Sequence, residues 1–135
     1  MLIAGLPGDA GHSQNVGWID VTSYSQSAGV RPCLKAVVTK ALDRATPGPA
    51  TFAVSGQKIP LATIEIWSGG VADHLVFRAK LEQVTVDQVE ILDEPGSAFS
   101  VLESIVLLPR RVTTEYITQA PTGLPGPIIT GTLAC

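Results

Sequence analysis

The sequence predicts a mainly β protein, and three observations support that prediction. Apolar and polar residues alternate with a period of two along most of the chain, and β-branched residues are common. Helical patterning is scarce. The chain has 135 residues, 45% of them hydrophobic, which is enough to bury one core without a metal ion or disulfide bonds. One long strand also changes its apolar face midway, as strands of small closed barrels do.

The alternation and the turn residues between the runs predict seven strands. They are Leu2–Leu6, Gly17–Ser25, Cys33–Lys40, Leu61–Trp67, His74–Val89, Val101–Leu108 and Arg111–Thr118. Turns are expected at Ser68–Gly70 and Asp93–Ser97, where glycine and proline free or fix the backbone. Because Val101–Leu108 is almost wholly apolar, both of its faces are expected to be buried.

The fifth of these strands is the most informative. Up to Leu81 its regularly spaced apolar residues have odd numbers, whereas from Val84 onward they have even numbers. A one-residue slip moves every side chain to the other face of a sheet. We therefore expect either a β-bulge near Gln83 or a strand that leaves one sheet for another.

The segment 46–56 leaves a short helix and a loop equally open. Thr46 could cap a helix whose first residue is Pro47, and Gly56 could end it. Gly48 and Pro49 in the first turn weaken the helical pattern. The residues from Ala120 onward are rich in proline and glycine and are expected to be extended or mobile, with a few apolar side chains available for docking.

Composition excludes several classes of function. A formal net charge of -3 and scattered basic residues argue against a nucleic-acid partner. No apolar run is long enough for a membrane span, and the first residues do not form a signal peptide. Charged residues make up only 16% of the chain, which is low for a free surface, so part of the outside is expected to be covered by other subunits.

The two cysteines give neither a disulfide framework nor a metal-binding knuckle. Cys33 lies in an apolar run and is expected to be a buried thiol, and Cys135 is expected to be exposed and unpaired. Free thiols favour folding in a reducing cytoplasm. With two histidines and no paired cysteines, no metal site is predicted.

Glycines at positions 5, 8 and 11 have the spacing of a phosphate-binding loop. A P-loop requires Lys and Ser or Thr after its last glycine, whereas Gly11 is followed by His12 and then by a predicted strand. Asp9 would also repel phosphate. The loop is therefore not expected to bind a nucleotide, and no cofactor is predicted.

His12, Asp20 and Ser23 are the ingredients of a nucleophilic triad, but no sequence elbow presents the serine. An exposed loop histidine is the preferred interpretation, and no catalytic residue is predicted. Arg78, Lys80 and Glu82 form a charged stripe on one face of the fifth strand. The stripe is either a solvated face, a wetted channel wall or a subunit contact.

Three blocks of residues occur in a recognisable order. Gly5, Gly8 and Asp9 precede the run Ile19–Ser25; Thr39, Lys40, Asp43, Ala45, Thr46, Pro47 and Gly56 form the second block; Glu103–Leu107 and then Tyr116 form the third. Together they resemble the haemolysin-coregulated protein family, the tube subunits of type VI secretion systems. The resemblance extends from about Leu2 to Thr118, which is most of the chain.

The resemblance implies a small β-barrel of two packed antiparallel sheets with one short flanking α-helix, which favours the helix at 46–56. It implies a barrel domain over residues 1–119 and a C-terminal tail over 120–135. Six copies would form a ring, and rings would stack into a hollow tube that a contractile sheath drives out of the cell. The partners implied are further copies of the chain, the tail-spike and sheath proteins, and effectors in the lumen. The role is structural and not enzymatic.

On this basis the expected subunit-interface residues are Gly8, Asp9, Gly11, His12, Tyr24 and Arg31, and the stripe Arg78, Lys80 and Glu82 is a candidate lumen or interface surface. The protein would be made in the cytoplasm without a signal peptide and then secreted. Two alternatives remain: a phage-like or other self-assembling tube, which shares the barrel and ring, and a small-molecule-binding β-barrel, which predicts a closed pocket and a monomer.

Overall fold

The computed structural model of the chain describes residues 1–69, 73–93 and 101–135. The described elements are β1 (Leu2–Ile3), β2 (Ser23–Ala28), β3 (Leu34–Ala41), α1 (Pro47–Ser55), β4 (Ile59–Trp67), β5 (Leu75–Asp93), β6 (Val101–Leu108), β7 (Arg111–Gln119) and β8 (Pro125–Ala134). Gly70 of the first expected turn and residues 94–97 of the second lie outside the described residues.

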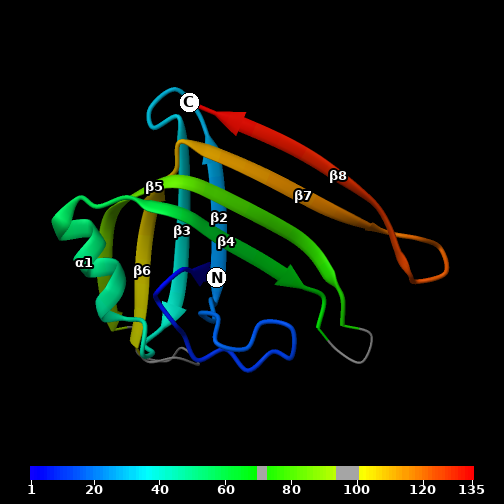
Figure 1. Cartoon of the computed structure of the whole chain (residues 1–135), viewed down its shortest axis with the longest axis horizontal. Helices are drawn as coiled ribbons and strands as arrows, with labels where there is room; N and C mark the ends of the chain where they lie inside the picture. The colour runs from blue at the N-terminus through cyan, green and yellow to red at the C-terminus, as the bar shows by residue number, and fades with distance from the viewer. Residues whose placement is uncertain (70–72, 94–100) are drawn as a thin grey trace.

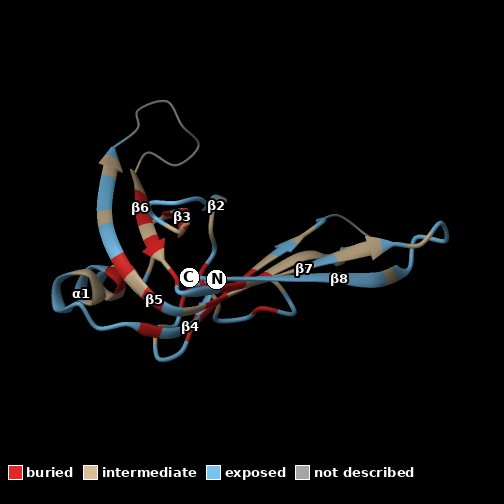
Figure 2. Ribbon diagram, turned by 90° about the horizontal axis from the view of Figure 1, so that it is seen from above, coloured by how far each residue is buried: buried red, intermediate tan, exposed pale blue. Residues whose placement is uncertain are grey.

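All strand pairs are antiparallel, and β5 belongs to two sheets. Its first half pairs with β4 on one side and β7 on the other, and β1 and β8 extend this sheet at its two edges. Its second half pairs with β6, which leads to β3 and β2. Figure 2 shows the two sheets curving around the buried residues, with α1 on the flank. The predicted fold class is confirmed.

The transfer of β5 between sheets occurs where the sequence changes its apolar face. Gln83 has a φ of 52°, a left-handed conformation seen at no other non-glycine residue of the described part. Ala79 and Leu81 are buried before it, and Val84 and Val86 are buried after it. The phase change predicted near Gln83 is therefore confirmed.

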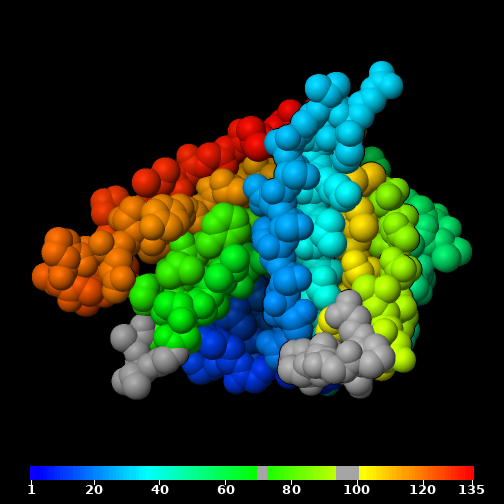
Figure 3. Space-filling view, turned by 180° about the vertical axis from the view of Figure 1, so that it is seen from behind, coloured from blue at the N-terminus to red at the C-terminus, as the bar shows by residue number. Residues whose placement is uncertain are grey.

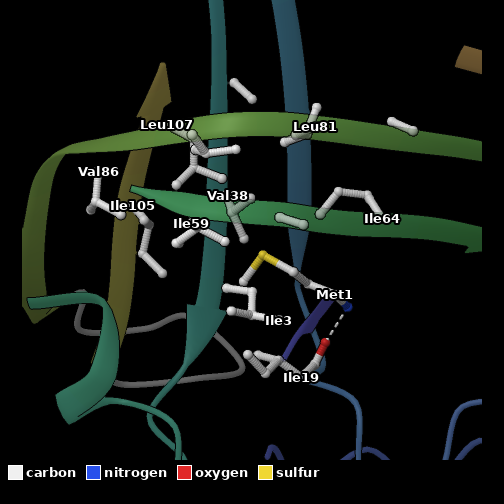
Figure 4. Packing of buried hydrophobic residues seen from close by; sticks show 14 of the residues in the cluster. Met1, Ile3, Ile19, Val38, Ile59, Ile64, Leu81, Val86, Ile105 and Leu107 are labelled. Atoms are coloured by element: carbon white, nitrogen blue, oxygen red, sulfur yellow. Dashed lines mark hydrogen bonds between the residues drawn. The ribbon is translucent and has the colours of Figure 1, made fainter. Parts of the chain in front are cut away.

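The core lies between the two sheets and is closed from below by the N-terminal segment (Figure 4). Val38 and Ile105 come from one sheet and Ile64 and Leu81 from the other, and each is at most 1% exposed. Met1, Ile3 and Ile19 pack against them from the first strand and the loop that follows it. Side chains fill the interior of the barrel.

Two expected strands are shorter than predicted or shifted. The first ends at Ile3 because the chain turns at Gly5, whose φ is 76°. The second begins at Ser23 instead of Gly17, because the residues before it hydrogen-bond to the N-terminal segment; Ile19 N–H, for example, donates to Met1 O over 2.7 Å. A period-two pattern does not distinguish these loop bonds from a sheet ladder.

The expectation that Val101–Leu108 is buried on both faces is wrong for the single chain. Glu103, Ile105 and Leu107 are buried, whereas the residues between them on β6 are half-buried. The inner face lies against the core, and no second layer of the described residues packs on the outer face.

The segment 46–56 is helical. Helix α1 begins at Pro47 and ends at Ser55, and its C-cap Gly56 has a φ of 71° and an N–H that donates to Phe52 O. Thr46 makes no side-chain cap bond. Gly48, which counts against a helix in the sequence, lies against Leu6, whose side chain would have to move to admit a Cβ 2.8 Å from its Cδ2.

The residues expected to form an extended or mobile tail build an edge strand. Strand β8 pairs with β7 from Arg111↔Ala134 to Gln119↔Pro125, and the resulting hairpin extends beyond the second sheet (Figure 1).

The prediction of two free cysteines is wrong, because Cys33 and Cys135 form a disulfide. Their 102-residue separation gave no local signal of the pairing. No helix of the described part is long and apolar enough to cross a membrane.

Candidate functional site

A buried charge network underlies the second and third blocks of the resemblance. Lys40 and Glu103 are directly opposite in the β3–β6 ladder, and both side chains are 0% exposed. Lys40 Nζ lies 3.1 Å from Glu103 Oε2 and 2.9 Å from Asp43 Oδ1. It also donates to Ala41 O and to Thr46 Oγ1. The network therefore ties β3 and β6 to the start of α1.

Sequence reasoning missed this network, although a signal was present. Lys40 follows Leu34, Ala36 and Val38 on the alternation that marks the buried face of β3. A lysine at such a position is almost never fully buried unless it is paired. Glu103 is the carboxylate at the buried position of β6 directly opposite.

The loop that contains Gly5, Gly8 and Gly11, which we call the glycine loop, folds back on itself and is held by backbone hydrogen bonds. Gly8 N–H donates to Gly17 O over 2.9 Å, and Ala10 N–H donates to Trp18 O over 2.8 Å. A Cβ at Gly8 would lie 2.6 Å from Cα of Ile19, so this position has to be glycine for packing. A Cβ at Gly11 would meet nothing within 4 Å.

Asp9 and His12 fasten this loop to two other segments. Asp9 Oδ2 accepts a bond from Arg44 N–H over 3.1 Å, beside α1. His12 Nε2 pairs with Asp73, and its ring lies 4.5 Å from that of Trp67. Its Nδ1 accepts from Gln14 N–H. Since both ring nitrogens are engaged, His12 has none left to activate Ser23.

Tyr24 and Arg31 differ in their surroundings. Burial raises the pKa of Tyr24 to about 12, and its hydroxyl donates to Gln26 Oε1 over 2.7 Å. Arg31 is exposed in the loop that joins β2 and β3. No described side chain hydrogen-bonds to it or forms an ion pair with it.

The charged stripe is the centre of an ion-pair network across three strands. Arg78 lies between Glu65 of β4 and Glu115 of β7, at 2.8 and 3.0 Å. Lys80 is 3.4 Å from Glu115, and Glu82 is 4.0 Å from Arg111. Burial alone would raise the pKa of Glu65, but hydrogen bonds from Asn15 and Arg78 outweigh it and lower that pKa.

The opposite face of the same sheet carries a row of large apolar side chains, which we call the apolar row. Its members are directly opposite one another on four strands: Ile66, Phe77, Tyr116 and Ile129. The row continues the core-facing side of the sheet, and within it the ring of Phe77 lies 6.3 Å from that of Tyr24 in β2. Ile66 is 41%, Tyr116 55% and Ile129 61% exposed.

The expected interface residues do not form one site. Gly8, Asp9, Gly11 and His12 lie in the glycine loop, at the end of the barrel where β3 finishes, whereas the β2–β3 loop with Arg31 lies at the opposite end (Figures 1 and 3). The apolar row was missed, because its exposure depends on which strands the second sheet covers. Within the described residues, no group of three or more His, Cys, Asp or Glu side chains is arranged to hold a metal ion.

Several solved structures have similar folds. Hcp1 from Salmonella typhimurium superposes with a TM-score of 0.86 over 98% of this chain and 90% of its own, at 20% identity. A type VI secretion system effector from Yersinia pestis superposes with a TM-score of 0.83 over 99% and 97%, at 15% identity. At such identities the likeness shows the fold alone.

Sequence comparison identifies the family. No curated protein matches the chain. The family model described as "Type VI secretion system effector, Hcp" matches residues 1–116, which includes all three blocks and the Lys40–Glu103 pair that joins two of them. The chain therefore belongs to the Hcp family of the type VI secretion system.

Proposed function

We propose that this protein is the subunit of a hexameric ring that stacks into the hollow tube of a type VI secretion machine. Its role is structural, and its partners are further copies of itself, the sheath and tail-spike proteins, and effectors held in the lumen. The apolar row is the observation that supports this proposal best.

The apolar row resembles one layer of a hydrophobic core. Its residues lie on the same face as the buried Ile64, Ala79 and Leu81. Phe77 is partly covered by Tyr24 of the second sheet, whereas the other three members of the row are more than 40% exposed. Burial of apolar surface contributes about 25 cal/mol per Å². A neighbouring copy can supply the missing layer, and identical head-to-tail contacts close into a ring when the rotation allows.

The charged stripe fits the same arrangement. It lies on the face of the sheet opposite the apolar row, where Arg78 and Lys80 form ion pairs with Glu65 and Glu115 of the neighbouring strands. Paired charges of this kind tolerate water. We therefore assign the stripe to the wall of the lumen, with the apolar row between subunits.

Substitution on the two faces of β8 tests the proposal. Ile129→Lys places a charge in the apolar row, whereas Thr130→Lys places the same charge one residue further on, opposite Glu115 on the other face. Light scattering after gel filtration should give a ring mass for the unaltered protein and for Thr130→Lys, and a monomer mass for Ile129→Lys. Electron micrographs should show rings in the first two samples.

A monomeric unaltered protein at high concentration would contradict the proposal and favour the small-molecule-binding barrel. That alternative has little support, since side chains fill the interior of the barrel. Rings that persist in Ile129→Lys would show that the interface lies elsewhere.

A further inference from the structure

The disulfide joins a free edge of one sheet to the free edge of the other. Cys135 follows β8, the edge strand of the first sheet, and Cys33 lies between β3 and β2, the edge strand of the second. Strand β8 pairs only with β7, and no ladder joins it to β2 in the described part of the chain. In Figure 1 the end of β8 meets the β2–β3 loop at the top of the molecule. The disulfide therefore ties together two edges that hydrogen bonds leave apart.

The two cysteines differ in their access to solvent. Cys33 is half-buried and packs against the hydrophobic core, whereas Cys135 is exposed. Thiol–disulfide exchange begins when a thiolate attacks one sulfur of the bond, so its rate depends on access to that sulfur. An incoming thiol therefore reaches Cys135 more easily than Cys33.

A groove of about 330 Å³ lies beside the exposed cysteine. Its walls are formed by Glu82, Gln83, Arg110, Arg111, Ala134 and Cys135. A site of about 10–15 Å³ already holds one water molecule. The groove therefore has room for a small molecule in contact with the disulfide.

Two arginines give this groove a positive rim. Both are exposed; Arg110 forms no ion pair with a described side chain, and Arg111 Nε lies 4.0 Å from Glu82 Oε2. Cys135 N–H donates to Arg110 O over 3.0 Å, which holds the backbone of Arg110 beside the disulfide. Guanidinium groups bind carboxylates well, because their fork of N–H donors matches two oxygens. The groove therefore favours a small molecule that carries carboxylates.

We propose that this groove is a redox site, in which a small thiol that carries carboxylates opens the disulfide by attacking Cys135. The thiolate forms a bond to Cys135 Sγ, the bond between the two Sγ atoms breaks, and Cys33 Sγ leaves with the electron pair and takes up a proton. A second thiol then attacks the sulfur of the bound one, which releases Cys135 as a thiol and the small molecule as a disulfide. Two small thiols thus lose the two electrons and two protons that the protein gains. The small disulfide closes the bond again by the reverse steps.

The open and closed forms differ in how β8 is held. In the open form β8 keeps its ladder to β7, but no covalent bond ties it to the β2–β3 loop. Cytoplasmic thiols keep disulfides reduced, whereas disulfides persist outside the cell. A chain that is made in the cytoplasm and then secreted therefore closes this bond after export. The reaction itself requires no ring, so its test is separate from that of the proposed function.

Single-cysteine variants test which sulfur reacts. Cys33→Ser and Cys135→Ser both lose the disulfide and each keeps one thiol, because the chain contains only two cysteines. Oxidised glutathione, a small disulfide with carboxylates, should form a mixed disulfide with Cys135 about tenfold faster than with Cys33. Mass spectrometry after an acid quench measures both rates, at a temperature where circular dichroism shows both variants folded. Equal rates, or a faster reaction of Cys33, would overturn the assignment to Cys135.

Substitution of the two arginines tests the groove in the chain that keeps its disulfide. The double variant Arg110→Gln, Arg111→Gln should slow opening by reduced glutathione about fivefold at low salt, because two exposed ion pairs are lost. The rate with 2-mercaptoethanol, an uncharged thiol, should stay within about twofold of the unaltered protein. Alkylation of the freed thiols followed by mass spectrometry measures each rate.

Arg44→Gln is the matched control. Arg44 pairs with Asp9 of the glycine loop, at the end of the barrel away from the disulfide, so both rates should be unchanged. Equal slowing with both thiols in the double variant, or no slowing with either, would overturn the groove as the binding site. A disulfide that glutathione opens only after urea has unfolded the chain would overturn the whole proposal.

Discussion

The Lys40–Glu103 pair gives the sharpest test of how this fold is held together. Lys40→Met keeps the length and apolar stem of the side chain and removes only the charged end. Glu103 then remains 0% exposed without its cation, while Asp43 keeps a bond from Ala45 N–H and some contact with solvent. The cost of the substitution should therefore come mainly from one carboxylate.

That cost can be estimated at about 3–5 kcal/mol. Removal of one partner from a buried ion pair generally costs this much, because it leaves a buried charge without compensation.

Urea unfolding followed by tryptophan fluorescence would measure the loss, at equal protein concentration because assembly adds concentration-dependent stability. Arg44→Met is the matched control. Its pair with Asp9 spans 3.7 Å and is more than half exposed, so the free energy of unfolding should change by less than about 1 kcal/mol. The double variant Lys40→Met, Glu103→Met should recover most of the stability, because it leaves no unpaired buried charge. A loss below about 1 kcal/mol in Lys40→Met would refute the reasoning.

Three further predictions concern other positions. Gly8→Val should destabilise the monomer, because the added side chain would overlap the backbone of Ile19. Gly11→Val should leave the unfolding midpoint unchanged and at most weaken assembly, because a Cβ there meets nothing within 4 Å. An equal loss of stability in both variants would contradict the packing argument. Cys135→Ser should lower the free energy of unfolding by about 2–5 kcal/mol, because the disulfide closes a long loop in the unfolded chain; the same midpoint with and without reductant would argue against the bond. In Tyr116→Phe the remaining phenol is Tyr24, whose absorbance at alkaline pH should show a pKa of about 12. The stability that comes from burying the neutral phenol is full below pH 10 and is lost as the pH rises toward 12. Ionisation of Tyr24 near pH 10 with the fold intact would be inconsistent with its burial.

Local patterns determined much of the fold. The period of two located most of the strands, and the change of phase near Gln83 located the transfer of β5 between sheets, because side-chain direction in a strand follows directly from position. Gly56 located the end of α1, because its left-handed conformation favours glycine. The three blocks in their order, two of which contain Lys40 and Glu103, were sufficient to suggest the family.

Contacts between distant segments were decided only by the tertiary structure. Strand β8 contains prolines that weaken any local strand signal, and it forms because an edge strand needs hydrogen bonds on one side only. The disulfide and the requirement for glycine at position 8 both depend on neighbours far along the chain. The alternation of β4, β5 and β7 assigns one face of the sheet to the core. Whether Tyr116 and Ile129 are covered on that face depends on where the second sheet ends, and no periodicity within a single strand contains that information.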